Sequence, residues 1–301
     1  MYTGGWWWST QARLDKHAGP GRTIIPILLS SDKTQVTLFR NKTVYPVYMT
    51  IGNIPKELRR KPSCRAYILV GYLPTTSLEH IKTNLFHACM RNIVRPLEAV
   101  GATGLVMASG DGVKRHCHPI FAAYISDYPE QMVVTCCISG NCPRCIIPRQ
   151  SIGENTDPYP SRQLRLILET LQMANDSASA FIKACRDANV KPVFDPFWAH
   201  LPYSNVYTSI TPDILHQLYQ GVFKHMKNWV IDTYGAHEID ACCRRLPPNH
   251  NVRIFTKGIS TLPRKNKHRH SLSGRFDTAL IPTMVCIKYH ALLLKVDVWP
   301  V

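Results

Sequence analysis

Apolar and polar positions alternate in short blocks over the first half of the chain, and this pattern predicts a sheet. Five runs rich in apolar and β-branched residues are typical of strands; they span residues 23–29, 44–51, 66–71, 104–108 and 119–125. Between the third and fourth runs, residues 78–100 carry apolar side chains at helical spacing and end before a glycine. We therefore expect three strands, a helix and two strands, with Asp32 after the first strand and Asp127 after the last.

The second half of the chain has a mainly helical pattern. Cysteines cluster between Cys136 and Cys145, and helices are expected over residues 161–190 and 213–234. The Pro- and aromatic-rich stretch between these helices is expected to be irregular but ordered. The patterns divide the chain into an N-terminal arm, an α/β core, a mainly helical Cys-containing insertion and a basic tail; these segments span residues 1–22, 23–135, 136–246 and 247–301.

The composition adds a strong basic excess. The 301 residues include 36 Lys and Arg against 20 Asp and Glu, which gives a formal net charge of +16. Such an excess predicts a polyanionic partner, most often nucleic acid. The side chains that we expect to contact DNA phosphates lie in two basic stretches; they are Arg59, Arg60, Lys61, Arg264 and Lys265. For either stretch alone, the alternative is a solvated charged surface.

The sequence also argues against a membrane or secreted protein. No stretch is apolar over the roughly 18 residues that a membrane-spanning helix needs. The N-terminus lacks the charged start and apolar run of a secretory signal. We therefore expect an intracellular protein, in which the 11 cysteines are thiols or metal ligands rather than disulfides. The Trp6-Trp7-Trp8 run either stacks on bases or, as is commoner, packs on the core.

Two aspartates at predicted strand ends are candidates for metal chemistry. Mg²⁺ and similar cations prefer carboxylate oxygens, and two-metal phosphoryl transfer needs carboxylates that converge from rigid elements. Asp32 and Asp127 meet that requirement, although an Asp after a strand is more often a turn or capping residue. The Gly110-Asp111-Gly112 segment is too short for a phosphate-binding loop and is better explained as a tight turn.

A CxxC knuckle at Cys142 and Cys145 is the candidate for a structural zinc site. A tetrahedral site needs two further ligands. Cys136 or Cys137 is one source, and the pair Asp213 and His216, one helical turn apart, is another. The alternative is a pair of free thiols. A redox role is disfavoured, because no thioredoxin-like βαβ pattern surrounds the knuckle.

Longer motifs make the sequence similar to a known family. They occur in consistent order and read WWWSTQ, TIIPILLSSDKTQVT, YPVYMTIGNIPKELRRKPS, GYLPT, NLFHACM, GDGVKRHCHPIFAAYISDYPEQ, CPRC, SITPDILHQLYQGVFKHMKNW and RRLPPNHNVRIFTKGIS. On these motifs, from about Trp6 to Ser260, the chain resembles the Plavaka-type transposases of fungal DNA transposons. Those transposases are similar to the CACTA group of cut-and-paste elements.

The resemblance implies a ribonuclease H-like mixed-sheet core with an Asp-Asp-Glu site for Mg²⁺ or Mn²⁺. Such enzymes cut transposon ends by hydrolysis and join the 3′ hydroxyl to target DNA. Asp32 in SSDKT matches the first acidic position and Asp127 in DYPEQ the second, with Asp111 as an alternative for the second. DNA as the partner, a nuclear location and assembly into a homo-oligomer are the corresponding expectations.

The resemblance also covers the candidate zinc ligands. The family's CxxC matches Cys142 and Cys145, and its DxxH element matches Asp213 and His216. These four positions make a shared structural metal site our hypothesis.

After the KGIS stretch the sequence departs from the family pattern. Family members continue with a helix that carries a Glu, whereas this chain reads TLPRKNKHRHSLSGRFDTALIPTMVC, in which Asp277 is a poor substitute. We therefore expect a truncated or divergent, catalytically impaired copy that lacks the third acidic residue. A non-catalytic DNA-binding remnant, or a domesticated derivative, is the alternative. An enzyme with a Cys nucleophile and His216 is supported by neither the charge nor the motifs.

Overall fold

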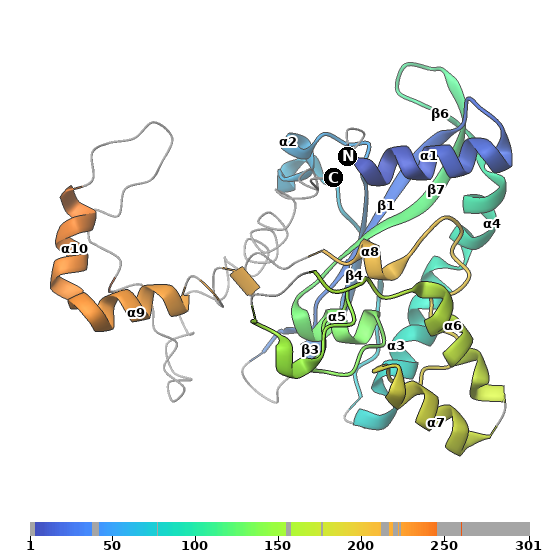
Figure 1. The fold of residues 1–301 in the computed structure, drawn as a ribbon. Coiled ribbons are helices and arrows are strands. Elements are labelled where there is room, and N and C mark those ends of the chain that lie inside the picture. Colours follow the sequence, from blue (N-terminus) through green and yellow to red (C-terminus); the bar gives the residue numbers. More distant parts are fainter. Residues whose placement is uncertain are drawn as a thin grey trace. The chain divides into compact units, whose positions relative to one another are not determined.

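The computed structural model shows an α/β unit and a second unit in which two helices are described (Figure 1). Of the described residues, those up to 211 belong to the first unit and those from 217 onward belong to the second. The described residues are 4–37, 42–76, 78–154, 158–175, 177–211, 217–218, 222, 224–245 and 260. Among them, no helix is long and apolar enough to cross a membrane.

The first unit is built on a five-stranded mixed sheet in the order β5–β4–β1–β7–β6 (Figure 1). Its strands are β1 (Thr23–Ser31), β4 (Pro46–Ile51), β5 (Ile68–Tyr72), β6 (Leu105–Ala108) and β7 (Lys114–Ile125), and a separate ribbon pairs β2 (Thr34–Gln35) with β3 (Thr43–Val44). The central strand β1 is antiparallel to β4 and parallel to β7. All five strand runs expected from the sequence are confirmed, and the mixed α/β arrangement fits a ribonuclease H-like core.

Helices precede, separate and follow the strands of the sheet in the chain. In the first unit they are α1 (Gly5–Ala18), α2 (Lys56–Arg59), α3 (Glu79–Val94), α4 (Pro96–Thr103), α5 (Tyr128–Val134), α6 (Leu164–Gln172), α7 (Ala178–Asp187) and α8 (Val206–Ser209), with 3-10 turns at Pro62–Cys64, Arg149–Ser151 and Met173–Asn175. The second unit contains α9 (Lys224–Tyr234) and α10 (Ala236–Arg245). The described part of 136–246 is therefore helical or irregular, and contributes no named strand.

Alternate residues of β1 supply the cores on the two faces of the sheet. Ile27 and Leu29 point into the main core, which contains residues from α3, α5, α6 and α7. Ile24 and Leu28 lie on the other face, where Trp6 of α1 packs against both of their clusters. This two-sided burial explains why TIIPILL reads as a continuous apolar run rather than an alternating one.

A bulge interrupts the pairing of β1 with β7. Ile27 pairs with Phe121, but the next residue, Leu28, pairs with Ala123, so Ala122 is an extra residue on β7. Ala122 and Ala123 consequently join the same buried cluster with Leu28. Such a bulge leaves one residue of the strand unpaired and bends the strand locally. Here it places two alanine methyl groups side by side on one face of the sheet.

One sequence prediction requires correction. The single helix expected over residues 78–100 is two helices, because the chain bends at Arg95–Pro96 and proline has no backbone N–H for a continuous helix. The second helix passes through Gly101 and ends at Thr103, before Gly104. Gly104 has φ +74, and a Cβ there would lie 2.6 Å from His116. The helix therefore ends at the glycine whose conformation and surroundings exclude a side chain.

The segment between α7 and α8 is irregular but belongs to the core, as the sequence predicts. Phe197 and Trp198 are almost completely buried. The Trp198 indole donates a hydrogen bond of 2.7 Å to the Val134 carbonyl, and the buried His87 ring lies 2.9 Å from the Val133 carbonyl. These contacts fix the C-terminal end of α5 against α3 and the irregular segment.

Candidate functional site

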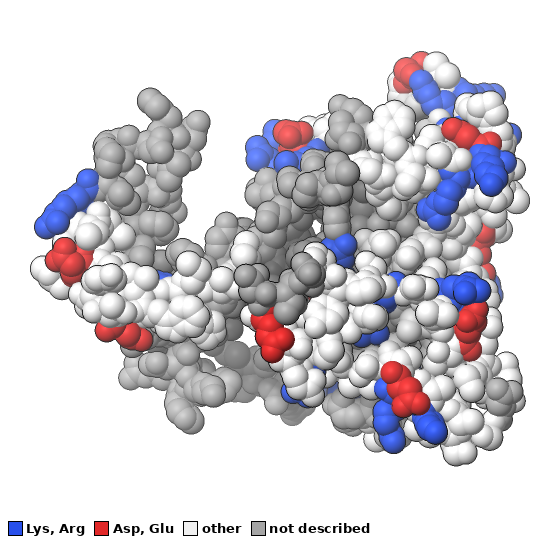
Figure 2. Space-filling model, viewed as in Figure 1, with Lys and Arg blue, Asp and Glu red and all other residues white. Residues whose placement is uncertain are grey.

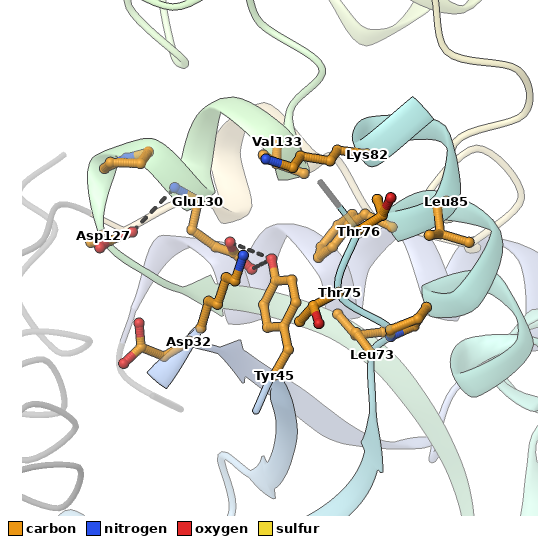
Figure 3. Close-up of a pocket in the computed structure, with 14 residues that line it drawn as sticks. Asp32, Tyr45, Leu73, Thr75, Thr76, Lys82, Leu85, Asp127, Glu130 and Val133 are labelled. Carbon is orange, nitrogen blue, oxygen red and sulfur yellow. Dashed lines mark hydrogen bonds between the residues drawn. The ribbon is translucent and has the colours of Figure 1, made fainter. Parts of the chain in front are cut away.

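The first two acidic candidates lie at neighbouring strand ends. In the parallel β1–β7 pair, Ser30 is opposite Ile125. Asp32 comes directly after β1, and Asp127 comes one residue after the end of β7. The carboxyl ends of parallel strands meet at the same edge of a sheet, so the two aspartates reach one location. Both line a cavity of about 340 Å³ beneath α3 and α5 (Figure 3).

Each aspartate is held by a local hydrogen bond. Asp127 is the N-cap of α5 and accepts a bond of 3.1 Å from the Glu130 backbone N–H. Thr34 donates its hydroxyl to the Asp32 carboxylate at 3.3 Å. Asp127 therefore is a helix cap, which was the structural alternative to a metal ligand. A carboxylate has several lone-pair positions, so capping a helix and binding a cation are compatible roles.

A third acidic residue in this cavity, Glu130, was not identified from the sequence. It lies on α5, and its buried carboxylate accepts hydrogen bonds from the hydroxyls of Tyr45 and Ser31. The Ser31 hydroxyl in turn lies 2.6 Å from that of Tyr124. Figure 3 shows Glu130 and Tyr45 pointing toward each other, with Asp127 at the start of the helix and Asp32 on the neighbouring strand end.

Glu130 is electrostatically linked to both aspartates. Its pKa is raised from 4.5 to about 7, mainly by burial; the bonds from Ser31 and Tyr45 oppose that rise, and the neighbouring Asp127 and Asp32 add to it. Burial and Glu130 also raise the pKa of Tyr45 far above its ordinary value. The cavity therefore strongly favours the neutral form of Tyr45 and weakens the acidity of Glu130. A carboxyl group responds in this way to burial and to the charge of other carboxylates in the same cavity.

The sequence contained a partial signal for Glu130. Asp127-Tyr-Pro-Glu130 has the spacing of a capping box, in which the residue at the third helical position turns back to the cap. That spacing predicts the helix start but not the burial of Glu130, which depends on the distant Tyr45.

The alternative acidic candidate, Asp111, lies elsewhere. It sits in the turn before β7 begins, whereas Asp127 follows the other end of that strand. Its carboxylate forms an ion pair of 2.8 Å with the half-buried Arg115. The hydrogen bond from the Arg115 guanidinium lowers the pKa of Asp111, and the hydrogen bonds from the Ser109 hydroxyl and the Val113 backbone N–H lower it further. The structure therefore does not bring Asp111 to Asp32.

The donor set of the cavity fits a hard divalent cation that keeps water ligands. Among the described residues, no three His, Cys, Asp or Glu side chains gather closely enough to hold a metal ion by themselves. Mg²⁺, however, is usually held by one or two carboxylates, with water and substrate phosphates completing its coordination. Asp32 and Asp127 supply that number, while the Glu130 carboxylate is occupied by hydroxyl groups.

The CxxC knuckle forms a tight turn at the edge of the helical region. The Arg144 backbone N–H donates to the Cys142 sulfur at 3.4 Å, and Cys145 pairs with Ser161. Burial raises the pKa of the Cys145 thiol, and Cys142 raises it further. Burial likewise raises the pKa of Cys137, to which Cys142 also contributes. The proposed partners Asp213 and His216 lie outside the described residues, so the described part of the chain brings together the thiols of Cys142 and Cys145 but no group of three metal ligands.

The basic and aromatic candidates have different surroundings. Arg60 and Lys61 are exposed, but Arg59 is only 3% exposed, so the expectation that it contacts DNA phosphates is not supported. Arg264 and Lys265 lie outside the described residues. Trp6 and Trp7 pack on the core, and Trp8 is 63% exposed. On the face in Figure 2, the described Lys and Arg side chains of the first unit are interspersed with acidic ones and form no single patch.

Comparison with known proteins gives one family. The family model described as Plavaka transposase matches residues 1–230, which include the whole sheet and both aspartates. No curated protein matches the chain.

Proposed function

This chain belongs to the Plavaka transposase family, and on that premise we propose that its cavity at Asp32 and Asp127 is the metal site of a DNA-cleaving and strand-joining transposase. The observation that carries the proposal is the pairing of β1 with β7, which brings both aspartates to one cavity. The finer assignment to the CACTA-like, Asp-Asp-Glu group is part of the same proposal. DNA is the partner that the family implies.

In this proposal, Asp32 and Asp127 hold Mg²⁺ or Mn²⁺ between neighbouring strand ends. When bound, such ions activate the attacking oxygen and stabilise the leaving oxygen at a phosphodiester. The rigid β1–β7 pair orients the two carboxylates, and the α5 backbone fixes Asp127 through its cap. Ser31 at the end of β1 donates a hydrogen bond to Glu130, and its hydroxyl lies 2.6 Å from that of Tyr124 on β7, so these contacts tie the two strand ends together.

We also propose that catalysis by this chain is impaired. Glu130 is the one further Asp or Glu among the described residues that line the cavity, and Ser31 and Tyr45 occupy its carboxylate. The family's third acid is expected beyond Ser260, where the sequence departs from the family pattern. The alternative function, DNA binding without cleavage, uses the same basic chain and requires no third acid.

Two further proposals concern the surroundings of this site. We propose a structural zinc ion at Cys142 and Cys145, with Cys136 or Cys137 and the Asp213–His216 pair as the candidate sources of further ligands; the interaction between the Cys142 and Cys145 thiols supports it. Nuclear location and assembly into a homo-oligomer follow from the proposed action on two transposon ends. Arg60 and Lys61, together with Arg264 and Lys265, are the proposed phosphate contacts.

The test is Mg²⁺-dependent nicking of DNA that carries the element's own terminal repeats. Three proteins are compared: the full chain, Asp127→Asn, which keeps the helix cap, and Asp111→Asn, which changes an exposed aspartate at the opposite end of β7. We expect slow nicking that Asp127→Asn abolishes and Asp111→Asn preserves. Duplex binding without nicking, equal in all three proteins, would favour the non-catalytic alternative. Nicking that survives Asp127→Asn would exclude the site.

A further inference from the structure

A second cavity lies on the other face of the sheet, where α1 packs. Its volume is about 440 Å³, within the range of small-molecule sites. Its floor is formed by Ala122 and Ala123, the two residues that the β7 bulge brings to the same face. Because methyl groups replace the larger side chains found elsewhere on this face, a hollow remains between the sheet, α1 and α8.

The lining of this cavity combines an aromatic wall with positive charge. Trp6, Arg13 and Arg144 are among the residues that line it. Arg13 donates a hydrogen bond of 2.6 Å to the Tyr203 carbonyl, which fixes its position at the rim. Among the described residues that line the cavity, none is Asp or Glu. Such a site favours a ligand with a flat apolar part and a negative charge.

A buried hydroxyl lies in the wall of this cavity. Ser209 of α8 is 1% exposed, and its oxygen has no hydrogen-bond partner among the described residues. An unpaired polar atom at such depth destabilises a fold unless water or a ligand satisfies it. Ser209 is among the residues that line the cavity, so water or a ligand held there can supply that partner.

We propose that this cavity binds one unpaired nucleotide of a DNA strand, with the base against Trp6 and the phosphate at Arg13 and Arg144. The inference rests on the proposed action on DNA but concerns a different face of the sheet from Asp32 and Asp127. Ser209 supplies a hydrogen bond to a base edge, and the alanine floor leaves room for the ring. Base stacking on an aromatic side chain tolerates any sequence, whereas the hydroxyl adds a preference among bases.

The test compares two duplexes, identical except that one contains a single unpaired nucleotide, by fluorescence anisotropy of labelled DNA. We expect the full chain to bind the duplex with the unpaired nucleotide roughly tenfold more tightly, the effect of losing one base stack in other proteins. Trp6→Leu, which keeps an apolar side chain on the core, should abolish the difference and leave binding of the paired duplex unchanged. Trp8→Leu, at an exposed position on the same helix, should preserve it.

Arg13→Gln provides a second variant, because Arg13 is exposed and lies outside the buried core clusters. Arg13→Gln should reduce the preference for the duplex with the unpaired nucleotide, and this measurement tests the cavity even if the Trp6→Leu variant does not fold. A 2-aminopurine at the unpaired position should lose fluorescence on binding to the full chain and not to Trp6→Leu.

Equal affinity for both duplexes would overturn the inference while leaving the proposed function intact. Failure to bind either duplex would overturn both. Free deoxyadenosine monophosphate serves as competitor; competition at the concentration that saturates the DNA site would assign the cavity to free nucleotides and overturn the DNA assignment.

Discussion

Replacing Glu130 by glutamine tests the electrostatics of the acidic cavity. A carboxyl group whose pKa rises from 4.5 to about 7 on folding is more stable protonated in the folded chain. The contribution of the protonated Glu130 to the unfolding free energy is fully present below pH 4.5 and is lost as the pH rises to about 7. The loss corresponds to about 3 kcal/mol of unfolding free energy. The glutamine side chain keeps the shape and does not ionise, so the Glu130→Gln variant should be more stable than the natural chain at pH 8 by up to that amount.

The assay is urea unfolding with EDTA at pH 4.5, 6 and 8, followed by tryptophan fluorescence. The buried Trp198 is bonded to the end of α5 and reports on this region. Burial lowers the pKa of His87 to about 4. The contribution of the neutral His87 to the unfolding free energy is therefore fully present above pH 6.5 and is lost as the pH falls toward 4. That opposite trend is present in both proteins and cancels in their difference.

Glu169→Gln is the matched control, since Glu169 is exposed on α6 and pairs only loosely with Arg165. It should leave stability nearly unchanged at every pH. The reasoning is refuted if Glu130→Gln is less stable than the natural chain at pH 8, or if the difference between them does not vary with pH. Either result would mean that Glu130 acts as an ionised acceptor for Tyr45 and Ser31.

Three further predictions concern single positions. Asp127→Ala should lower the unfolding free energy by about 1 kcal/mol through loss of the helix cap, while Asp127→Asn should lower it little; urea unfolding measures both, and equal losses would contradict the capping role. Gly104→Ala should cost about 2 kcal/mol because of its positive φ and the nearby His116; an unchanged melting temperature would count against that strain. Elemental analysis should find zinc in the natural chain and in the Cys64→Ser variant but not in Cys145→Ser. Equal zinc content in all three proteins would exclude the proposed zinc site.

The strands were predictable because each is encoded by its own sequence. TIIPILL is buried on both faces, and its apolar content marks it as a strand whatever surrounds it. The positions of Asp32 and Asp127 then follow from the strand ends. The helix boundary at Pro96 was missed because apolar periodicity continues across the bend at Arg95.

Glu130 could not be predicted for a different reason. Its burial depends on Tyr45, 85 residues earlier in the chain, and on the end of β1. Local sequence shows only that Glu130 lies in the first turn of a helix. The β7 bulge was hidden in the same way, because Ala122 is an extra residue only relative to its partner strand β1.

The position of β1 at the centre of the sheet has a consequence for synthesis of the chain. Its parallel partner β7 begins to pair at Cys117, opposite Thr23, so the ribosome must add roughly ninety residues before that edge is covered, which takes about 5 to 18 seconds. Until then the apolar edge of β1 can pair with other nascent chains. A fragment that ends before β7 should therefore aggregate, and chaperones that bind nascent chains should engage this protein between the emergence of β1 and that of β7.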